Sequence, residues 1–274
     1  MRQEHKAEMK ARKRNVRLLV AYDGTNYHGF QYQNPTVIAV QNVLEEVLEK
    51  IFGDKIEMAA SGRTDAGVHA LGQVVNFFTD GTIPLERVPM AANSLLPSDI
   101  TILEAQEADR DFSARHSAQS KSYIYKILNA PRPDPFLRNS AWHIKKELDI
   151  ASMEKCLKML EGKHDFSAFR ATGGPDVSPV RNIFSAKLKI SDREKLPYEN
   201  GYWNNTDNGK IIEMRFFADG FLYHQVRNMV GTLANVGMGR TSAEKFKEIF
   251  EGLDRTKAGA TAPAQGLYLE KVNY

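Results

Sequence analysis

The order of the predicted secondary-structure elements constrains this chain of 274 residues more than any other feature. Apolar residues alternate with period 2 in the expected strands and recur three and four positions apart in the expected helices, and each half of the chain runs strand, helix, strands, helix. Two halves of similar order indicate a duplicated α+β unit with a cleft between the copies. We therefore expect a basic, disordered tail at 1–15, an N-terminal α/β subdomain at 16–115 and a C-terminal α/β subdomain at 116–274.

Two helices can be placed in more detail. The helix predicted for 37–52 has Thr36 as its N-cap and ends at Gly53. The helix predicted for 222–237 contains Gly231, which costs about 1 kcal/mol relative to alanine and therefore indicates close packing at that point. The polar segment 191–210 is expected to form a mobile hairpin loop. The other expected elements are strands at 16–24, 55–61, 72–78, 99–105, 122–128, 184–190 and 209–217, and helices near 85–95 and at 150–162.

The net charge of +3 is distributed unevenly along the chain. Residues 1–17 carry a local charge of +5 and residues 110–146 carry +6, so the remainder carries −8. Basic groups meet phosphates, and aromatic rings interleaved with them can stack on unpaired bases, so the second segment suits nucleic acid. A solvated sheet face with a few core aromatic residues would have the same composition. The interleaved aromatic residues are Phe112, Tyr123, Tyr125, Phe136 and Trp142.

Several classes of protein and of site are excluded. No apolar run approaches the roughly 18–20 residues that span a bilayer, and residues 1–17 lack the apolar core of a secretory signal, so we expect no membrane and a cytoplasmic location. The single cysteine, Cys156, excludes an intramolecular disulfide and a cysteine-built metal site. The histidines show no HExxH spacing, and the patterns GxxxxGK[ST] and GxGxxG are missing. We therefore expect no metal and no cofactor.

The stretch "SGRTDAGVHA" at 61–70 is the strongest candidate for an active site. Arg63 and Asp65 lie between Gly62 and Gly67, directly before an expected strand. Such a pair is either a surface ion pair worth under about 1 kcal/mol or the reactive end of a site. An aspartate facing an arginine in a partly dry cleft stays ionised, and its carboxylate can attack an electron-poor carbon or stabilise an oxocarbenium-like sugar. The residues alone indicate carboxylate chemistry linked to RNA, of a kind that they leave open.

Motifs along nearly the whole chain resemble those of the tRNA pseudouridine synthase A family, which isomerises uridine in the tRNA anticodon stem-loop. "SGRTDAGVHALGQV" resembles the signature of that family. "YDGTNYHGFQYQ" resembles its first turn, with Phe30 where tryptophan is frequent. The other similar blocks follow in the family order: "LPSDI", "DFSARHSAQSKSYIYKI", "HDFSAFR", "DGFLYHQVRNMVGTL", which has Gln225 where methionine is common, and "TAPAQGLYLEKV".

The resemblance implies a role for several residues. Asp65 matches the catalytic aspartate, Tyr123 the tyrosine that stacks on the target base and handles the C5 proton, and Arg227 the arginine that pairs with the aspartate. Arg63 matches an arginine that holds the flipped nucleotide. The further expected substrate-binding residues are Gly62, Gly67, His69, Arg115 and Lys121.

The resemblance also implies a fold and an assembly. The fold is an α+β pseudouridine synthase fold, with two related α/β lobes that share a central mixed sheet and have the active-site cleft between them. The implied reaction converts uridine to pseudouridine at tRNA positions 38, 39 and 40 without metal or cofactor, and the implied assembly is a homodimer. The alternative is a non-catalytic RNA-binding protein or chaperone on the same scaffold. A glycoside or nucleoside hydrolase using Asp65 would need a second acid, and no second carboxylate stands out.

Overall fold

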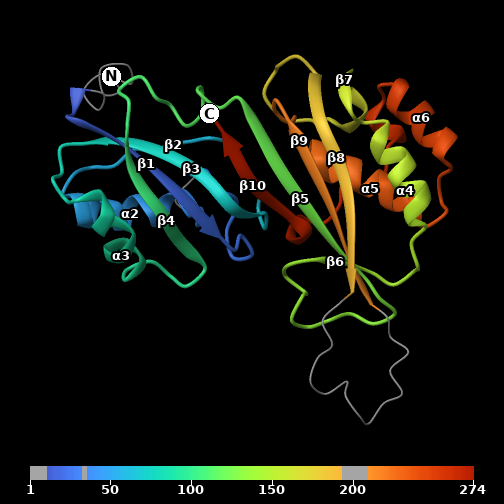
Figure 1. Cartoon of the computed structure of the whole chain (residues 1–274), viewed down its shortest axis with the longest axis horizontal. Helices are drawn as coiled ribbons and strands as arrows, with labels where there is room; N and C mark the ends of the chain where they lie inside the picture. Colours follow the sequence, from blue (N-terminus) through green and yellow to red (C-terminus); the bar gives the residue numbers. More distant parts are fainter. Residues whose placement is uncertain (1–10, 33–35, 193–208) are drawn as a thin grey trace, which may run out of the picture. The chain divides into compact units, whose positions relative to one another are not determined.

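The computed structural model describes residues 11–32, 36–192 and 209–274. The chain divides into two compact units. Unit 1 comprises Met1–Lys121 and Tyr268–Tyr274, and unit 2 comprises Ser122–Leu267. The division after Lys121 lies six residues beyond the expected boundary, and the last seven residues return to unit 1 instead of staying with the C-terminal half. Each unit is an α+β structure with a mixed sheet, as expected from the sequence (Figure 1).

The sheet of unit 1 is built around β3. Its strands are β1 (Arg14–Tyr22), β2 (Ala59–Ala60), β3 (His69–Thr79), β4 (Ile100–Ala108) and β10 (Leu267–Asn273), in the order β4-β1-β3-β10 with β2 paired to β3. β1 pairs antiparallel with β3 and with β4, whereas β10 pairs parallel with the start of β3, Tyr268 opposite His69. The sheet is therefore mixed, and β3 is its central strand.

Helix α2 (Val40–Phe52) covers the sheet of unit 1, together with the short η1 (Leu85–Arg87) and α3 (Val88–Asn93). The helix ends at Gly53 as predicted, but its N-cap is Ala39 instead of Thr36. Thr36 is not needed as a cap, because other groups accept the first N–H groups of the helix. Asn42 Oδ1 accepts the Ala39 N–H, and the carbonyls of Gly29 and Phe30 accept those of the next two residues. The buried face of α2 contains Val40, Leu44, Val47, Leu48 and Phe52.

The strand expected at 55–61 is reduced to β2. The N–H of Ile56 donates to Glu49 Oε1 and the N–H of Met58 donates to Glu45 Oε1. Side chains of α2 therefore accept the backbone N–H groups that would otherwise pair with a neighbouring strand. The predicted disordered tail at 1–15 was also wrong at its end. Arg14 and Asn15 belong to β1, and the buried Asn15 side chain donates to the carbonyls of Asp109 and Phe112. Residues 1–10 of the expected tail lie outside the described residues.

Unit 2 has the sheet order β5-β9-β8-β7, with β6 paired parallel to β5. Its strands are β5 (Ser120–Asn129), β6 (Trp142–Ile144), β7 (Gly162–Asp165), β8 (Val180–Asp192) and β9 (Lys210–Ala218). The helices α4 (Ile150–Lys158), α5 (Gln225–Gly237) and α6 (Ala243–Glu251) lie together on one side of β8 and β9 (Figure 1). The short turns η2 (Ser167–Phe169), η4 (Arg255–Lys257) and η5 (Ala264–Gly266) complete the unit.

Several details of unit 2 differ from the sequence-based expectations. The helix expected over 150–162 ends at Lys158, and Gly162 begins β7 instead of closing the helix. The helix expected from residue 222 begins at Gln225, because His224 has a left-handed backbone. The strands β6, β7 and β10 and the helix α6 were not predicted. The predicted hairpin loop falls mainly at 193–208, outside the described residues.

The close packing expected at Gly231 is confirmed. A Cβ at this position would lie far inside van der Waals contact of the Ala260 carbonyl oxygen, so the segment after η4 rests directly on the backbone of α5. Elsewhere, four rings fill the core between η2 and α6 at centroid distances of 5.3–6.1 Å. These rings belong to Phe166, Phe169, Phe246 and Phe250.

Candidate active site

The loop 61–68 of unit 1 packs against the turn that follows β1. The N–H of Phe30 donates to the carbonyl of Thr64 at 3.1 Å, and the N–H of Gly67 donates to the carbonyl of Tyr27 at 3.2 Å. Gly29 has φ 88°, and a Cβ there would lie 2.6 Å from the Thr64 carbonyl oxygen. Only a glycine lets the two backbones approach this closely. The sequence motif around 23–30 therefore supports the loop that contains Asp65.

A buried hydrogen bond fixes the centre of the loop. The hydroxyl of Tyr22, on β1, lies 2.7 Å from Thr64 Oγ1, and either oxygen can donate. Both side chains are buried, and burial raises the pKa of Tyr22 above its usual range, so its hydroxyl keeps its proton. Thr64 therefore points into the unit. Its two neighbours point outward: Asp65 is half-buried and Arg63 is exposed.

A second set of hydrogen bonds fixes the start of the loop. Ser61 donates its N–H to the Val74 carbonyl at 2.8 Å and its hydroxyl to Gln73 Oε1 at 2.5 Å. The buried Gln73 side chain donates to the Gly62 carbonyl at 2.9 Å. Lys121 Nζ donates to the Ser61 carbonyl at 2.6 Å. This ammonium group is largely buried. Its burial, and then the nearby Arg115 charge, lower the pKa of Lys121.

His69 anchors the end of the loop. It is 3% exposed, and its ring stacks on Tyr268 of β10 with a centroid distance of 4.7 Å. Its Nδ1 lies 3.0 Å from the Gly24 amide nitrogen and 3.0 Å from Asp23 Oδ1. Nδ1 cannot accept the Gly24 N–H and at the same time donate a proton to Asp23. The buried Gly24 N–H donates to Nδ1, whereas Thr25 already donates to Asp23.

Tyr123 and Arg227 belong to unit 2. Tyr123, on β5, is half-buried, and its ring lies edge-on to Phe221 with a centroid distance of 5.2 Å. Arg227, in the first turn of α5, donates from Nε to the Ala262 carbonyl at 2.8 Å, and the Ala262 N–H donates back to the Arg227 carbonyl at 3.1 Å. The close contact at Gly231 brings this same segment onto α5.

The backbone at the start of α5 is strained. His224 is its N-cap and has φ 58°, which costs a non-glycine residue about 1–2 kcal/mol. Its ring stacks on Tyr223 at 4.0 Å, and its Nε2 lies 3.5 Å from Arg227 Nη1. Strain of this kind is frequent at functional sites.

The structure thus divides the predicted residues between the units. Unit 1 contains Asp65, Arg63 and the predicted substrate-binding set, and unit 2 contains Tyr123 and Arg227. Arg115 is exposed, whereas His69 and Lys121 bind other parts of unit 1. Three supporting residues, Tyr22, Gln73 and Tyr268, were not foreseen. Tyr22 and Tyr268 reach the loop from distant parts of the sequence, whereas Gln73 lies within the motif 61–74 and folds back onto its start.

Within 11–32, 36–192 and 209–274, no three His, Cys, Asp or Glu side chains are grouped so that they could hold a metal ion. No helix of this part of the chain is long and apolar enough to cross a membrane.

Comparison with known proteins identifies the family. The family model described as tRNA pseudouridine synthase matches residues 18–117 and 156–274. A "tRNA pseudouridine synthase A" of Thermoanaerobacter sp. (strain X514) is 43% identical over 261 residues, covering 95% of this chain and 100% of that protein. Its namesake from Acetivibrio thermocellus is 42% identical over 261 residues with the same coverage. The namesake from Moorella thermoacetica is 43% identical over 263 residues, covering 94% of this chain and 99% of its own.

A solved structure, an archaeal box H/ACA sRNP Nop10-Cbf5 complex, aligns with a TM-score of 0.29 and 12% identity over 82% of this chain and 54% of that one. This alignment is too loose to carry an argument. The sequence relatives, in contrast, extend over almost the whole chain and favour the enzyme over the non-catalytic RNA-binding alternative. The chain belongs to the tRNA pseudouridine synthase family, whose members are isomerases.

Proposed function

We propose that this chain converts uridine to pseudouridine at positions 38, 39 and 40 of the tRNA anticodon stem-loop, with Asp65 as the catalytic carboxylate. The names of the relatives support tRNA as the substrate. The observation that carries the proposal is the way in which the loop 61–68 is held. Thr64 is fixed by Tyr22 and Phe30, while the adjacent Asp65 stays half-buried at the surface of unit 1. A carboxylate on a rigid loop meets the geometric demand of attack at a sugar carbon.

The proposed reaction needs no external atoms. The Asp65 carboxylate promotes cleavage of the bond between uracil N1 and ribose C1′, either by attacking C1′ or by way of a glycal-like intermediate. The electrons of the broken bond leave with uracil as an N1 anion. The base rotates in place and its C5 bonds to C1′. On the first route this bond displaces the carboxylate, and on the second Asp65 returns to C2′ the proton that it took when the glycal formed. A base then removes the C5 proton, and N1 gains a proton, so that product and reactant have the same atoms.

Tyr123 and Arg227 are proposed for the roles that the resemblance implies. Tyr123 stacks on the target base and, directly or through a water, removes the C5 proton. Arg227 is the cationic partner of the catalytic aspartate. The hydrogen bonds between Arg227 and Ala262 support a defined position for the guanidinium group, and the edge-on contact with Phe221 supports a defined position for the phenol ring. Arg63, Gly62, Gly67, His69, Arg115 and Lys121 stay proposed as substrate-binding residues.

The target base is stacked or paired in tRNA and must be flipped out, at a cost of a few kcal/mol that binding of the remaining RNA offsets. We propose that a homodimer grips the tRNA and that the protein acts in the cytoplasm, as the resemblance implies. Light scattering of the purified chain tests the dimer: a mass near twice 30.9 kDa is expected, and a monomer would contradict it.

Mapping the product tests the proposed target positions. The purified chain is incubated with a tRNA transcript that has uridine at 38, 39 and 40, and pseudouridine is located by carbodiimide modification and primer extension. We expect product at these positions and no product in a transcript with cytidine at all three. Product elsewhere in the tRNA, or in the cytidine transcript, would contradict the proposed specificity.

A further inference from the structure

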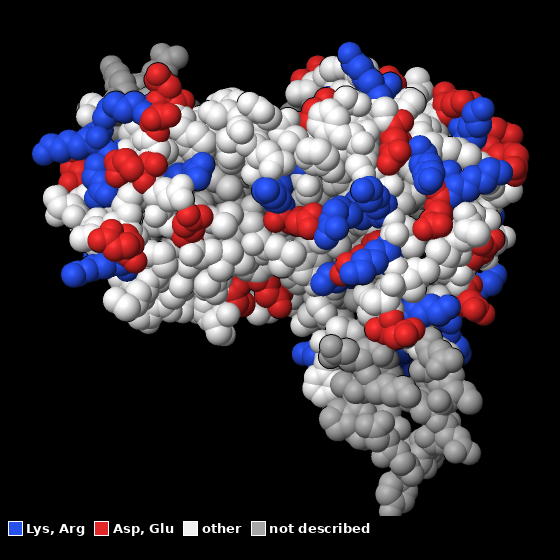
Figure 2. All heavy atoms as spheres, in the orientation of Figure 1, with Lys and Arg blue, Asp and Glu red and all other residues white. Residues whose placement is uncertain are grey.

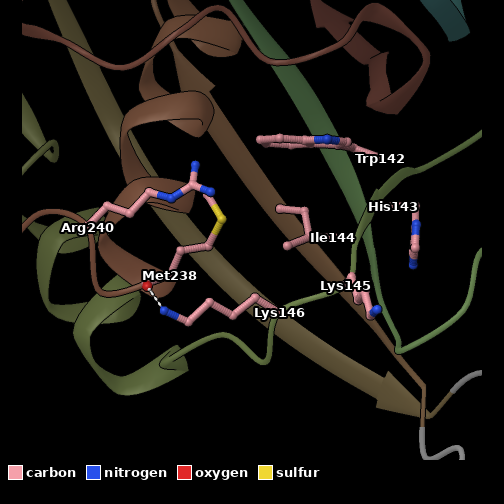
Figure 3. Close-up of a pocket in the computed structure, with 7 residues that line it drawn as sticks. All are labelled: Trp142, His143, Ile144, Lys145, Lys146, Met238 and Arg240. Carbon is pink, nitrogen blue, oxygen red and sulfur yellow. Dashed lines mark hydrogen bonds between the residues drawn. The ribbon is translucent and has the colours of Figure 1, made fainter.

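Unit 2 contains an open pocket of about 610 Å³ that is lined by residues 142–146 and by Met238 and Arg240 (Figure 3). Three of its lining side chains are cations, Lys145, Lys146 and Arg240, and none is a carboxylate. By contrast, the lysines of α6 pair with acids of the same helix, Lys245 with Glu248 and Lys247 with Glu251, and Figure 2 shows both signs of charge interspersed over α4 and α6.

One wall of the pocket is held by β5. β6 pairs in parallel with it, Trp142 opposite Ile127, and the buried Asn129 side chain donates to the carbonyls of Ile144 and Lys146, both at 2.8 Å. The His143 ring nitrogen Nε2 lies 2.8 Å from the Ala130 carbonyl, to which it can donate. The segment 142–146 is therefore fixed by backbone pairing and by a buried amide, not left as a free surface loop.

The other wall is the C-terminal turn of α5. Gly239 has φ 68°, its N–H donates to the Val236 carbonyl at 2.8 Å, and the Arg240 N–H donates to the Asn235 carbonyl at 2.9 Å. This pair of bonds is the Schellman motif, in which the left-handed residue reverses the chain. The motif fixes the Cα of Arg240, and in Figure 3 its side chain extends along the pocket.

A lysine joins the two walls. Lys146 Nζ donates to the carbonyl of Met238 at the end of α5, where the helix dipole also favours a cation. Lys146 therefore links the segment 142–146 to the end of α5. Within the part of the chain that the structure describes, the side chains of Lys145 and Arg240 form no hydrogen bond and no ion pair. Both cations are exposed, and in Figure 3 they lie on opposite sides of the segment 142–146, with no acid among the pocket residues.

Trp142 adds an apolar surface to this pocket. Its ring is half-buried and lies edge-to-face with the buried Tyr125, at a centroid distance of 6.3 Å and an angle of 87°. Figure 3 shows the indole along one side of the pocket, with a flat face toward Ile144 and Arg240. Cations together with an accessible aromatic face are the combination that binds a nucleic acid backbone with an adjacent base or sugar.

We propose that this pocket is a second RNA-binding site, which takes a backbone phosphate of the anticodon stem-loop at Arg240 and an adjacent base or ribose against Trp142, while Lys145 adds positive charge from the other side of the segment 142–146. This inference rests on the proposed function. The distance between this pocket and Tyr123 follows from the register of β5. Trp142 is opposite Ile127, and Ile127 lies four residues from Tyr123 on the same face of the strand. At about 3.3 Å per residue the separation is about 13 Å. The bound phosphate therefore belongs to the stem-loop that contains the target uridine, not to a distant part of the tRNA.

Binding measurements with two RNAs test the proposal. The double variant Lys145→Gln/Arg240→Gln is compared with the wild type and with Lys245→Gln, which removes a paired surface cation of α6. Dissociation constants are measured over a series of salt concentrations for whole tRNA and for an isolated 17-nucleotide anticodon stem-loop. We expect the double variant to bind both RNAs about tenfold more weakly, with a salt dependence smaller by about one counterion. Lys245→Gln should match the wild type.

Further variants separate a structural effect from loss of an RNA contact. Trp142→Leu should weaken stem-loop binding and Trp142→Phe should restore most of it, with thermal melting curves close to the wild type. Unchanged affinity and salt slope in the double variant would overturn the proposal. A loss confined to whole tRNA would place the pocket against a distant part of the tRNA, and a changed oligomeric state with unchanged stem-loop affinity would make it a protein interface; both results would also overturn it.

The wild-type assays keep this inference separate from the proposed function. If the wild type binds the stem-loop but forms no pseudouridine, the proposed function fails while the binding comparison still decides whether the pocket contacts RNA. If the wild type forms pseudouridine and the double variant has the same KM and the same affinity, the pocket proposal fails alone.

Discussion

The carbonyl oxygen of Thr64 lies 2.6 Å from the point that a Cβ would occupy at Gly29. The loop that contains Asp65 and the turn after β1 are therefore in direct backbone contact. A shift of either segment moves the other.

Gly29→Ala should destabilise the protein and lower its turnover. The new methyl group must push the Thr64 carbonyl away, and the left-handed backbone adds its own cost, so we expect a loss of about 2–4 kcal/mol in the free energy of unfolding. Gly53→Ala is the matched control, because Gly53 has φ 73° but open space around it. This control should lose only about 1–2 kcal/mol, with unchanged kcat. Equal losses for the two variants in urea unfolding would show that the contact with Thr64 is unimportant.

The buried bond between Tyr22 and Thr64 should couple these residues energetically. Tyr22→Phe removes the partner of the buried Thr64 hydroxyl, and Thr64→Val removes the 2.7 Å partner of the buried Tyr22 hydroxyl, so each should lose about 1–3 kcal/mol. The double variant leaves neither atom unpaired, so its loss should be smaller than the sum of the two single losses. Urea unfolding of all four proteins measures the coupling. Additive losses would mean that the hydroxyl groups do not depend on one another.

Gly231→Ala should be far more harmful than Gly237→Ala, although both glycines lie in α5. At Gly231 the methyl group would meet the Ala260 backbone carbonyl, whereas at Gly237 it would meet chiefly the flexible end of the Met153 side chain. We expect Gly231→Ala to displace the segment that carries Ala262, the partner of Arg227, and so to lower both stability and kcat. Gly237→Ala should retain kcat, because helix propensity favours alanine by about 1 kcal/mol and the Met153 sulfur can move. Comparable kcat values for the two variants would refute this account.

Asp54 should stabilise unit 1 in a pH-dependent way. Its Oδ2 accepts bonds from the Thr79 hydroxyl at 2.6 Å, the Asp80 N–H at 2.6 Å and the Gly81 N–H at 3.1 Å. The Thr79 bond first, then the two amides and the Arg12 charge, hold the pKa of Asp54 below its usual value against the opposing effect of burial. A lowered carboxyl pKa contributes stability that is complete above the unfolded value of about 3.9 and is lost as the pH falls through the folded value.

Comparing Asp54→Asn with the wild type tests this pH dependence. Because Asp54 is only partly buried, we expect the variant to lose about 1 kcal/mol at pH 7. The two proteins should approach equal stability as the pH falls below about 3.9. Urea unfolding at pH 7, 5 and 3 gives the comparison. A difference that stays constant over this range would mean that the charge on Asp54 has no part in it.

Much of the fold could be read from local sequence patterns, and the exceptions have two causes. Helical spacing located α2 and α5, and alternation located β1, β3, β8 and β9. The N-cap of α2 and the strand at 55–61 were wrong because side chains of α2 itself, Asn42, Glu45 and Glu49, take backbone groups nearby. The return of β10 to β3 was missed because a parallel pairing between the end and the beginning of a chain leaves no local signal.

In the candidate site, too, the contacts between distant parts of the chain could not be predicted from local sequence patterns. The motif pointed to Asp65 directly, since a charged pair in a glycine-flanked turn is visible in ten residues. Tyr22, which holds this turn, belongs to an ordinary-looking strand, and its role becomes visible only once β1 and β3 are paired. The same is true of the pocket between β6 and the end of α5, whose two walls are about a hundred residues apart in the sequence.

Release of tritium from uridine C5 tests the central claim most directly. The wild type, Asp65→Asn and Asp111→Asn, a control that removes an exposed carboxylate of unit 1, are incubated with tRNA labelled with tritium at uridine C5, and tRNA binding is measured for each. We predict release by the wild type and Asp111→Asn, and none by Asp65→Asn despite retained binding. Release by Asp65→Asn at the wild-type rate would contradict the assignment of Asp65 as the catalytic carboxylate.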